Sequence, residues 1–384
     1  MLNSLQIKNY RLLNDFTVSK LGRVNLIVGK NNAGKSTVLE ALRIYAANGQ
    51  RSVLEQITTS HDAKVRLRSD ETESDFDIPF ADLFTGRRFP EDNAIINIGE
   101  LNSSENRLSL QHVYVVQTED QITDDSGETA TRMRRSFRTR TELVANNELA
   151  TSLALLIKRS NRAAWIDLSN DGPRYNRVNP EITPIIPCAY IPTRFIDQDE
   201  LAVEWDTIAL TNHHSRLKDA MKIIAPDFED LVFVHAEDNP LYPRRSARRT
   251  AKLKMSGQSH PVPLGSMGDG MLRLLQLTLK IFPAQGGFLL IDEFENGLHY
   301  TIQEKVWALV FELAMKLDIQ VFATTHSWDC IKSYARIAHQ RTDVEGVLFR
   351  VGKSALSSNT GQVIATVFDE SQIDSITESE IEVR

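Results

Sequence analysis

The stretch GKNNAGKS, Gly29 to Ser36, constrains the fold of this chain more than any other feature. It fits the pattern G-x-x-x-x-G-K-[ST] at every fixed position, with an apolar stretch before it and a helical pattern after it. Glycines let the backbone N–H groups of such a loop turn inward around phosphate oxygens, and the following helix start adds positive partial charge. A chance glycine turn is the competing interpretation, which the matching flanks disfavour. The pattern predicts a nucleotide phosphate site.

Each side chain in this stretch has an expected role. We expect the ammonium group of Lys35 to reach the β- and γ-phosphates and to assist catalysis. The hydroxyl of Ser36 is expected to bind Mg²⁺. The residues predicted to contact ATP are Gly29, Asn31, Asn32, Ala33, Gly34, Lys35, Ser36 and Thr37.

A phosphate loop of this kind needs an acidic partner at the end of a neighbouring strand, and FLLIDE supplies one. We expect Asp292 to hold the magnesium shell and Glu293 to accept a proton from the attacking water or to orient it. The alternative is a strand that ends in a helix-capping acid. His326 ends the apolar stretch FATTH, where a side chain can face a ligand at the edge of the sheet, so we assign it to the γ-phosphate.

The hydrophobic pattern predicts strands that alternate with helices, which is typical of an α/β fold with a parallel sheet. Two strands near Leu5–Ile7 and Phe16–Val18 are expected to turn at Asn14-Asp15. Further strands are expected at 23–29, 94–101, 108–118, 231–235, 288–292 and 319–325, with an edge strand at 347–351. Helices are expected at 36–47, 215–224, 271–282 and 302–317, and an acidic loop at 119–128.

Composition excludes several classes of protein. Two cysteines among 384 residues argue against a disulfide framework or zinc site and fit a reducing cytoplasm. No apolar run approaches the length of a membrane span, and the N-terminus is too polar for a signal peptide. The net charge of −7 argues mildly against a chain coated in nucleic acid. Two basic stretches, Arg132–Arg140 and Arg244–Lys254, keep nucleic acid open as a partner, although solvated faces are the favoured interpretation.

Taken in order, GKNNAGKS, GSMGDG, FLLIDEFENGLH and ATTHS resemble the motifs of an ABC-type ATPase head of the SMC/RecF/OLD class. The opening LQIKNYRLLNDF and VNLIVG resemble the first strands of such heads. The resemblance implies a P-loop NTPase with a mixed sheet and a β-rich or helical insertion. It divides the chain into an N-terminal lobe at 1–47, an insertion at 48–187, a C-terminal lobe at 188–351 and a tail at 352–384.

In such heads a serine-glycine signature caps the γ-phosphate bound by a partner subunit. The resemblance therefore implies a homodimer or higher oligomer around ATP and Mg²⁺. The residues that match the signature are Ser266, Gly268, Asp269 and Gly270, with Met267 and Asp269 departing from the usual pattern. Where such heads carry a glutamine loop, this chain offers Thr193 or Arg194, with Gln198 close by.

DEFENGLH is especially similar to stand-alone OLD-like ATPases, several of which serve in bacterial anti-phage defence. An OLD nuclease adds a Toprim domain, but no D-x-D pair follows His326. By analogy we expect a separately encoded effector, such as a Toprim-type nuclease or a toxin. Two alternatives stay open: an ATP-dependent scaffold with little turnover, and a RecF-like DNA-repair ATPase.

Overall fold

The computed structural model describes residues 1–60, 80–90, 93–103, 105–123, 129–168, 186–235, 249–356 and 359–368. Its central sheet has the strand order β16-β15-β3-β14-β13-β9. The parallel strands are β3 (Val24–Val28), β9 (Cys188–Ile191), β13 (Phe288–Ile291), β14 (Gln320–Thr325) and β15 (Gly346–Lys353). At one edge β16 (Val363–Phe368) pairs with β15 antiparallel, so the sheet is mixed.

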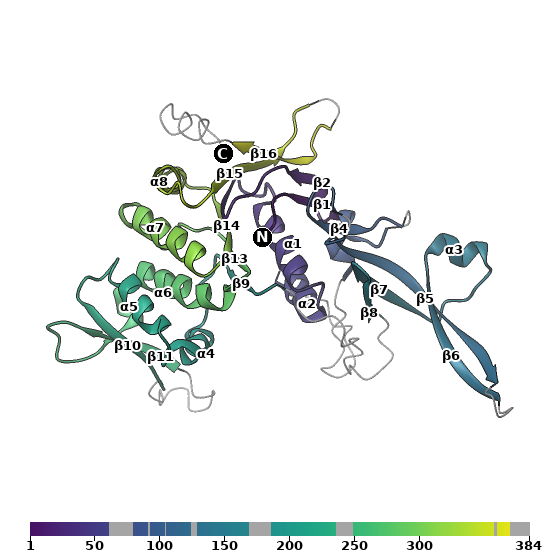
Figure 1. Cartoon of the computed structure of the whole chain (residues 1–384), viewed down its shortest axis with the longest axis horizontal. Coiled ribbons are helices and arrows are strands. Elements are labelled where there is room, and N and C mark those ends of the chain that lie inside the picture. Colours follow the sequence, from purple (N-terminus) through teal and green to yellow (C-terminus); the bar gives the residue numbers. More distant parts are fainter. Residues whose placement is uncertain are drawn as a thin grey trace, which may run out of the picture.

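A second sheet is antiparallel and has the order β2-β1-β4-β5-β7-β8, with β6 also paired to β5. Its strands are β1 (Leu5–Tyr10), β2 (Leu13–Val18), β4 (Ile96–Gly99), β5 (Leu108–Thr123), β6 (Thr129–Arg138), β7 (Ser152–Arg159) and β8 (Arg162–Asp167). Strands from the segment 48–187 thus continue the sheet that the first eighteen residues begin. In Figure 1 the long β5–β6 hairpin extends away from the centre.

The helices are α1 (Lys35–Ala46), α2 (Arg51–Thr59), α3 (Arg140–Ala145), α4 (Gln198–Ile208), α5 (His213–Met221), α6 (Asp269–Ile281), α7 (Tyr300–Lys316) and α8 (Trp328–Gln340). Short 3-10 turns lie at Phe80–Leu83, Thr85–Arg87, Leu264–Met267 and Phe282–Ala284. A small third sheet joins β10 (Phe228–His235), β11 (Arg249–Met255) and β12 (Val262–Pro263). Figure 1 places this sheet beside α4, α5 and α6, on the far side of the central sheet from β5 and β6.

The alternation of side chains along the central strands builds two cores. Leu289 and Ile291 face one core, which the helices α4 to α8 complete. Phe288 and Leu290 face the other, which contains α1 and the antiparallel sheet. Successive side chains of a strand point to opposite faces, so a strand that is apolar throughout must be covered on both sides. The helix after the phosphate loop is therefore enclosed between the two sheets.

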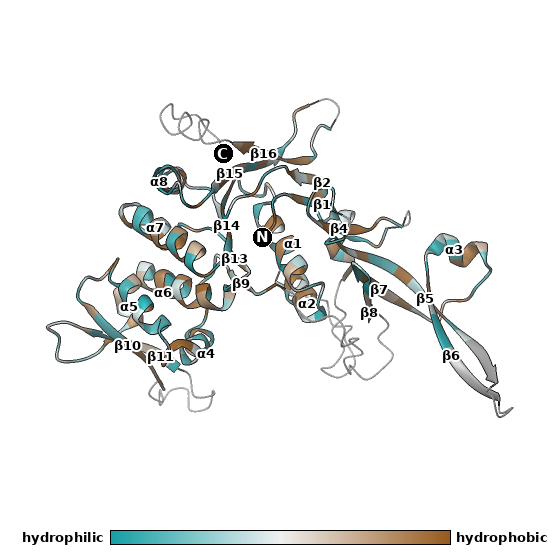
Figure 2. Cartoon of the chain, viewed as in Figure 1, coloured by the Kyte–Doolittle hydropathy of each residue, from teal (hydrophilic) through white to brown (hydrophobic). Residues whose placement is uncertain are grey.

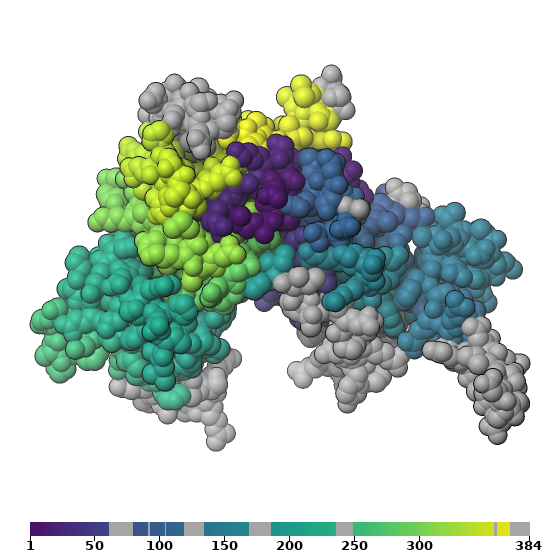
Figure 3. Space-filling view, in the orientation of Figure 1, coloured from purple at the N-terminus to yellow at the C-terminus, as the bar shows by residue number. Residues whose placement is uncertain are grey.

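The distribution of hydrophobic residues agrees with these two cores. In Figure 2 the helices α5, α6 and α7 carry both hydrophilic and hydrophobic residues, as expected for helices with one buried face. On α7 the buried residues include Val306, Val310 and Leu313, which lie on one face of the helix expected at 302–317. The helical lobe contains α4 to α7 and the third sheet, and the hairpin arm is formed by β5 and β6. Figure 3 shows them as two projections on opposite sides of the N-terminal strands.

The expected fold class, an α/β P-loop ATPase head with a mixed sheet, is confirmed: the phosphate-loop strand lies inside the central sheet. Three local expectations were wrong. The first hairpin turns at Arg11-Leu12 rather than at Asn14-Asp15, because Tyr10 pairs with Leu13. The strand β5 continues to Thr123 through part of the expected acidic loop, because β6 pairs with it along that length. Strand β15 is not an edge, since β16 covers it.

Gly287 allows the close approach of β9 and β13. A Cβ atom at this position would lie 1.9 Å from the carbonyl oxygen of Pro187, which accepts a hydrogen bond from Phe288. We predict that Gly287→Ala lowers stability by about 3 kcal/mol, because the backbone must move or lose pairing. Thermal unfolding measures the effect, and Gly265→Ala is the control, since nothing lies within 4 Å of its added Cβ. Equal midpoints for both variants would contradict the prediction.

Candidate active site

The phosphate loop lies at the carboxyl end of β3 and packs against β15. Gly29 has φ 154°, and a Cβ there would lie 2.3 Å from the carbonyl oxygen of Val351. Only glycine fits this approach without displacing the strand. Asn31 and Asn32 are exposed, Ala33 is half-buried, and Gly34 and Thr37 are buried. The start of the loop is thus packed against the sheet, while Asn31 and Asn32 at its tip are exposed.

Lys35 lies buried under the loop. Its Nζ donates to the carbonyl oxygens of Gly29 at 2.8 Å and Lys30 at 3.0 Å. Burial lowers the pKa of Lys35 from its usual value, while the carboxylates of Glu293 and Asp292 oppose that change. The ammonium group is positioned at the loop, with acidic side chains near enough to favour its charged form.

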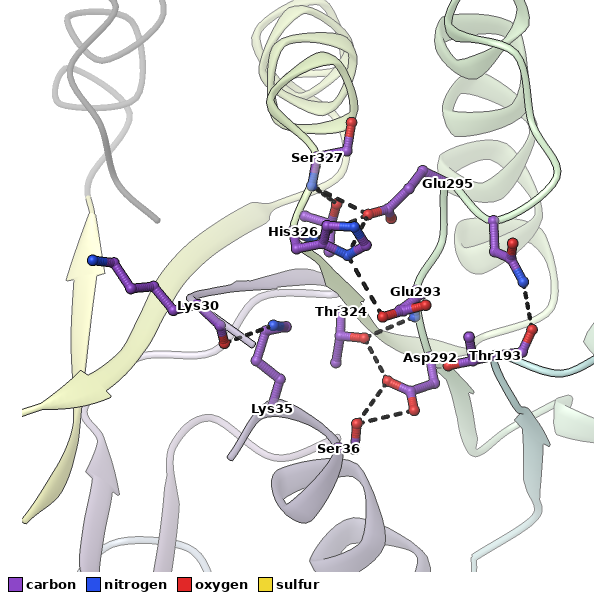
Figure 4. A network of polar contacts seen from close by, with 12 residues as sticks. Lys30, Lys35, Ser36, Thr193, Asp292, Glu293, Glu295, Thr324, His326 and Ser327 are labelled. Atoms are coloured by element: carbon purple, nitrogen blue, oxygen red, sulfur yellow. Dashed lines mark hydrogen bonds and ion pairs between the residues drawn. The ribbon is translucent and has the colours of Figure 1, made fainter. Parts of the chain in front are cut away.

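A chain of hydrogen bonds joins the phosphate loop to two neighbouring strands (Figure 4). The hydroxyl of Ser36 lies 3.0 Å from both carboxylate oxygens of Asp292, at the end of β13. Thr324 on β14 donates to Asp292 Oδ1 at 2.7 Å. The same hydroxyl of Thr324 accepts from the backbone N–H of Glu293 at 2.8 Å. Three segments far apart in sequence therefore converge at one edge of the sheet.

The backbone at Glu293 is in the left-handed region, with φ 49°. For a residue with a side chain this costs about 1–3 kcal/mol and persists only where the surroundings impose it. The hydrogen bond to Thr324 imposes it on one side. On the other, the fully buried ring of Phe294 stacks on Trp307 with centroids 3.7 Å apart. This fixed backbone conformation sets the direction in which the Glu293 side chain leaves the chain. The side chain itself is 32% exposed.

His326 follows β14 and faces two carboxylates. Its Nδ1 lies 3.5 Å from Glu293 Oε1 and 3.2 Å from Glu295 Oε1. The ring is about half exposed, in contrast to the buried threonines that precede it. The structure therefore brings together Lys35, Asp292, Glu293 and His326, which the sequence predicted separately.

The side chains at this edge suit a magnesium ion. The hydroxyl of Ser36 and the carboxylate of Asp292 are the hard oxygen donors that Mg²⁺ prefers. In the part of the chain that the structure describes, no group of three or more His, Cys, Asp and Glu residues could hold a metal ion. Phosphate oxygens and water would thus have to supply the other ligands, which is usual for Mg²⁺ bound with a nucleotide.

The signature segment lies elsewhere, in the helical lobe. Ser266 is on the 3-10 turn before α6, and Gly268 precedes the first residue of that helix. Ser266, Gly268 and Asp269 are exposed and Gly270 is half-buried, and the only described hydrogen bond of the Ser266 hydroxyl goes to the carbonyl of Pro263. Among the described residues, no hydrogen bond joins this segment to the phosphate loop. Its helix start has no side-chain cap, so the first backbone N–H groups of α6 lack a capping side chain.

In the structure, the side chain of Gln198, the glutamine nearest the loop between β9 and α4, bonds the third sheet and has no described bond to Ser36 or Asp292. Gln198 accepts hydrogen bonds from Thr250 and from the backbone of Ala251 on β11. Its side chain is thus used to attach α4 to the third sheet. Thr193 accepts a hydrogen bond from the Asn296 side chain through its backbone carbonyl, and Arg194 is exposed.

Sequence reasoning missed Arg273, which is fully buried on α6. Its guanidinium donates to the backbone carbonyls of Asp292 and Glu293, each at 2.8 Å, and of Pro192 at 2.8 Å. Burial lowers the pKa of Arg273 to about 10, against the opposing pull of Asp292 and Glu295. An arginine inside the apolar run MLRLLQL was the available signal. Thr324 and Glu295 were also missed, although both lie in the quoted motifs.

Several basic residues of the stretches 132–140 and 244–254 form contacts within the chain. Arg138 forms an ion pair with Glu148, and the guanidinium of Arg135 lies 5.5 Å from the centre of the Trp165 ring. In the second stretch Arg249 pairs with Asp206, and Lys254 pairs with Glu229. Residues 244–248 lie outside the described residues. Within the described chain, no helix is both long and apolar enough to span a bilayer.

Comparison with known proteins agrees with this geometry. Residues 1–172 match a family of AAA ATPase domains. Residues 216–329 match a family described as an AAA domain, putative AbiEii toxin, Type IV TA system. These matches support an ATPase of the AAA type. Both families overlap the residues that form the site.

Two curated relatives are similar to the chain. An ATP/GTP phosphatase of Helicobacter pylori is 20% identical over 350 residues, covering 89% of each chain. An uncharacterised protein of Methanocaldococcus jannaschii is 44% identical over 45 residues, which are 12% of this chain and 20% of that protein.

Structural similarity to SMC heads is weak but extends over nearly the whole chain. An SMC head bound to the C-winged helix domain of ScpA has a TM-score of 0.46 at 14% identity, covering 96% of this chain and 98% of that one. The Thermotoga maritima SMC head domain has a TM-score of 0.43 at 12% identity, covering 96% and 99%. A Pyrococcus furiosus head with an extended coiled coil has 0.47 at 12% identity, covering 99% of both.

The buried hydroxyl of Thr324 holds both acidic residues of the site. We predict that Thr324→Val lowers stability by about 1–3 kcal/mol, because it leaves the N–H of Glu293 without its acceptor. Thr278→Val is the matched control, since that buried hydroxyl bonds only carbonyls of its own helix. Thermal unfolding compares the two variants. A Thr324→Val midpoint no lower than that of the control would count against the assigned role.

Proposed function

We propose that the chain binds ATP with Mg²⁺ and hydrolyses it to ADP and phosphate at the carboxyl edge of the central sheet. The observation that carries the proposal is the bond from Ser36 of the phosphate loop to both carboxylate oxygens of Asp292, with Glu293 as the next residue. A hydroxyl hydrogen-bonded to a carboxylate, next to a glycine-rich loop, provides the groups that bind the phosphates of a nucleotide and its metal ion. The H. pylori relative, named an ATP/GTP phosphatase, supports triphosphate hydrolysis.

The side chains divide the chemistry among them. Lys35 exchanges its bonds with the loop carbonyls for bonds with β- and γ-phosphate oxygens when nucleotide enters. Backbone N–H groups from Gly29 to Thr37 surround the phosphates. Glu293 orients the attacking water and accepts its proton, and His326 contacts the γ-phosphate. When bound, Mg²⁺ neutralises developing charge on the phosphate oxygens.

The signature segment completes the site of a second copy. Ser266, Gly268, Asp269 and Gly270 lie at a largely exposed helix start without a side-chain cap, and the backbone N–H groups of such a start suit an anion. Within one chain no described hydrogen bond brings them to the phosphate loop, so we place them over the nucleotide of a partner in a head-to-tail dimer. Two chains then enclose two ATP molecules, and nucleotide occupancy controls the assembly.

The proposal includes a partner protein that the assembly acts on. We propose that ATP-driven assembly controls a separately encoded effector in anti-phage defence. Support comes from DEFENGLH, which is similar to stand-alone OLD-like ATPases, and from the family description that names a putative AbiEii toxin of a type IV TA system. Identification of proteins that co-purify with ATP-loaded chain from its native host tests this part.

Substitution of the general base Glu293 separates ATP turnover from ATP binding. We expect Glu293→Gln to lower kcat for ATP by about 100-fold or more, because a general base contributes that much, while ATP affinity changes little. Phosphate release and binding of a fluorescent ATP analogue measure the two quantities. Glu304→Gln is the control, an exposed glutamate on α7. Wild-type turnover should also stop when EDTA removes Mg²⁺. Full activity in Glu293→Gln would refute the assigned role.

Mixing two inactive variants tests the shared site. Lys35→Ala removes the phosphate-loop cation, and Ser266→Arg blocks the signature segment. Each variant alone should be inactive. A mixture should regain about a quarter of the wild-type rate, because half of randomly assembled dimers are mixed and each has one intact site. A mixture as inactive as its parents would argue that the signature does not act across the dimer.

A further inference from the structure

Glu295 is an acidic residue at the site that the proposed mechanism does not use. Its side chain is only 11% exposed. Its Oε1 accepts hydrogen bonds from the backbone N–H groups of His326 at 3.0 Å and Ser327 at 3.1 Å. The same oxygen lies 3.2 Å from Nδ1 of the His326 ring. One carboxylate oxygen therefore holds both the backbone and the ring of the histidine (Figure 4).

The segments on both sides of this contact are fixed by independent interactions. Phe294, which precedes Glu295, is stacked on Trp307 inside the helical core. The backbone N–H of Ser327 also donates to the hydroxyl of Thr325, and the hydroxyl of Ser327 caps α8 by accepting from the backbone N–H of Cys330. Glu295 thus lies on a loop fixed by the packing of Phe294, and it bonds the backbone at the start of α8, which Ser327 caps. Side chains held in this way are preorganised for a role in catalysis.

The contact also decides which ring nitrogen carries the proton. A carboxylate can only accept hydrogen bonds, and Nδ1 lies within reach of two carboxylates, those of Glu293 and Glu295. In a neutral ring Nδ1 must therefore be the protonated nitrogen. Nε2 is then left with a lone pair, which can accept a proton or a hydrogen bond.

We propose that Glu295 is a positioning residue that holds His326 in its Nδ1–H form and at a fixed backbone position beside Glu293. The second carboxylate oxygen, Oε2, is buried and has no hydrogen-bond partner in the described chain. Leaving a carboxylate oxygen unpartnered is costly, so the bonds of Oε1 must compensate for it. The catalytic consequence of this inference rests on the proposed ATPase function, whereas its structural content does not.

Two variants separate positioning from simple stability. Glu295→Ala removes all three contacts, and we expect kcat to fall by about 30- to 100-fold with a KM change below about threefold, because a small displacement of a catalytic group costs this much. Glu295→Gln keeps an acceptor oxygen and should recover kcat to within about fivefold of wild type. Glu312→Ala, which removes an exposed glutamate of α7, is the control and should match wild type. Thermal unfolding of each variant reports its folding.

A second readout does not depend on turnover. The chain has nine histidines, so ¹⁵N-histidine labelling gives a tractable NMR spectrum, and His326→Gln assigns the signal. We expect neutral His326 to carry its proton on Nδ1 in wild type and Glu295→Gln, and to lose this preference in Glu295→Ala. An Nε2–H form in wild type, or an unchanged form in Glu295→Ala, overturns the inference. So does a kcat in folded Glu295→Ala within twofold of wild type.

The two levels of the proposal fail in different ways. If the wild-type chain hydrolyses no ATP, the proposed function is wrong, and the NMR result alone decides whether Glu295 sets the form of His326. If wild type is active but Glu295→Ala matches it, the proposed function stands and the inference about Glu295 is wrong.

Discussion

The bond between the Ser36 hydroxyl and the Asp292 carboxylate is the contact on which the rest of the site depends. It joins the phosphate loop, formed near the N-terminus, to a strand more than two hundred residues later in the sequence. Parallel neighbours end at the same edge of a sheet, so this one register places Glu293, Thr324 and His326 beside the loop. Each of these groups then supports another, because Thr324 bonds both acidic residues.

The backbone of Glu293 illustrates how the site holds strain. A left-handed glutamate is unfavourable by itself, yet its N–H bonds Thr324 and its carbonyl accepts from Arg273. Arg273 belongs to α6, the helix that begins at the signature segment. A buried guanidinium therefore connects the outward-facing helix start to the backbone of the acidic pair. A displacement of α6 would therefore move the Arg273 guanidinium and strain or break its hydrogen bonds to the backbone of Asp292 and Glu293.

Much of this arrangement was predictable from sequence. The phosphate loop and FLLIDE have local patterns that fix both structure and placement, so the central sheet and its ligand edge followed from them. The pairing of the antiparallel sheet did not follow, although four of its strands were expected, because these strands pair across long separations, as β1 does with β4. The expected edge strand at 347–351 was wrong because β16 pairs with it, and the β-branched stretch VIATVF of β16 was a strand signal that was not used. Gln198 offered a suitable residue type near the right place, but only its contacts with β11 showed that it serves packing.

The position of β3 in the central sheet affects how the chain can be made. Both of its neighbours, β14 and β15, come from the last quarter of the sequence, while β3 itself ends at Val28. Domains synthesised from the N-terminus must keep such a strand unpaired until its distant neighbours emerge from the ribosome. The phosphate loop therefore gains its supporting neighbours only after residues 320–353 have been synthesised. A nascent chain that carries the whole phosphate loop but ends before residue 320 lacks both strands that flank β3 in the folded sheet.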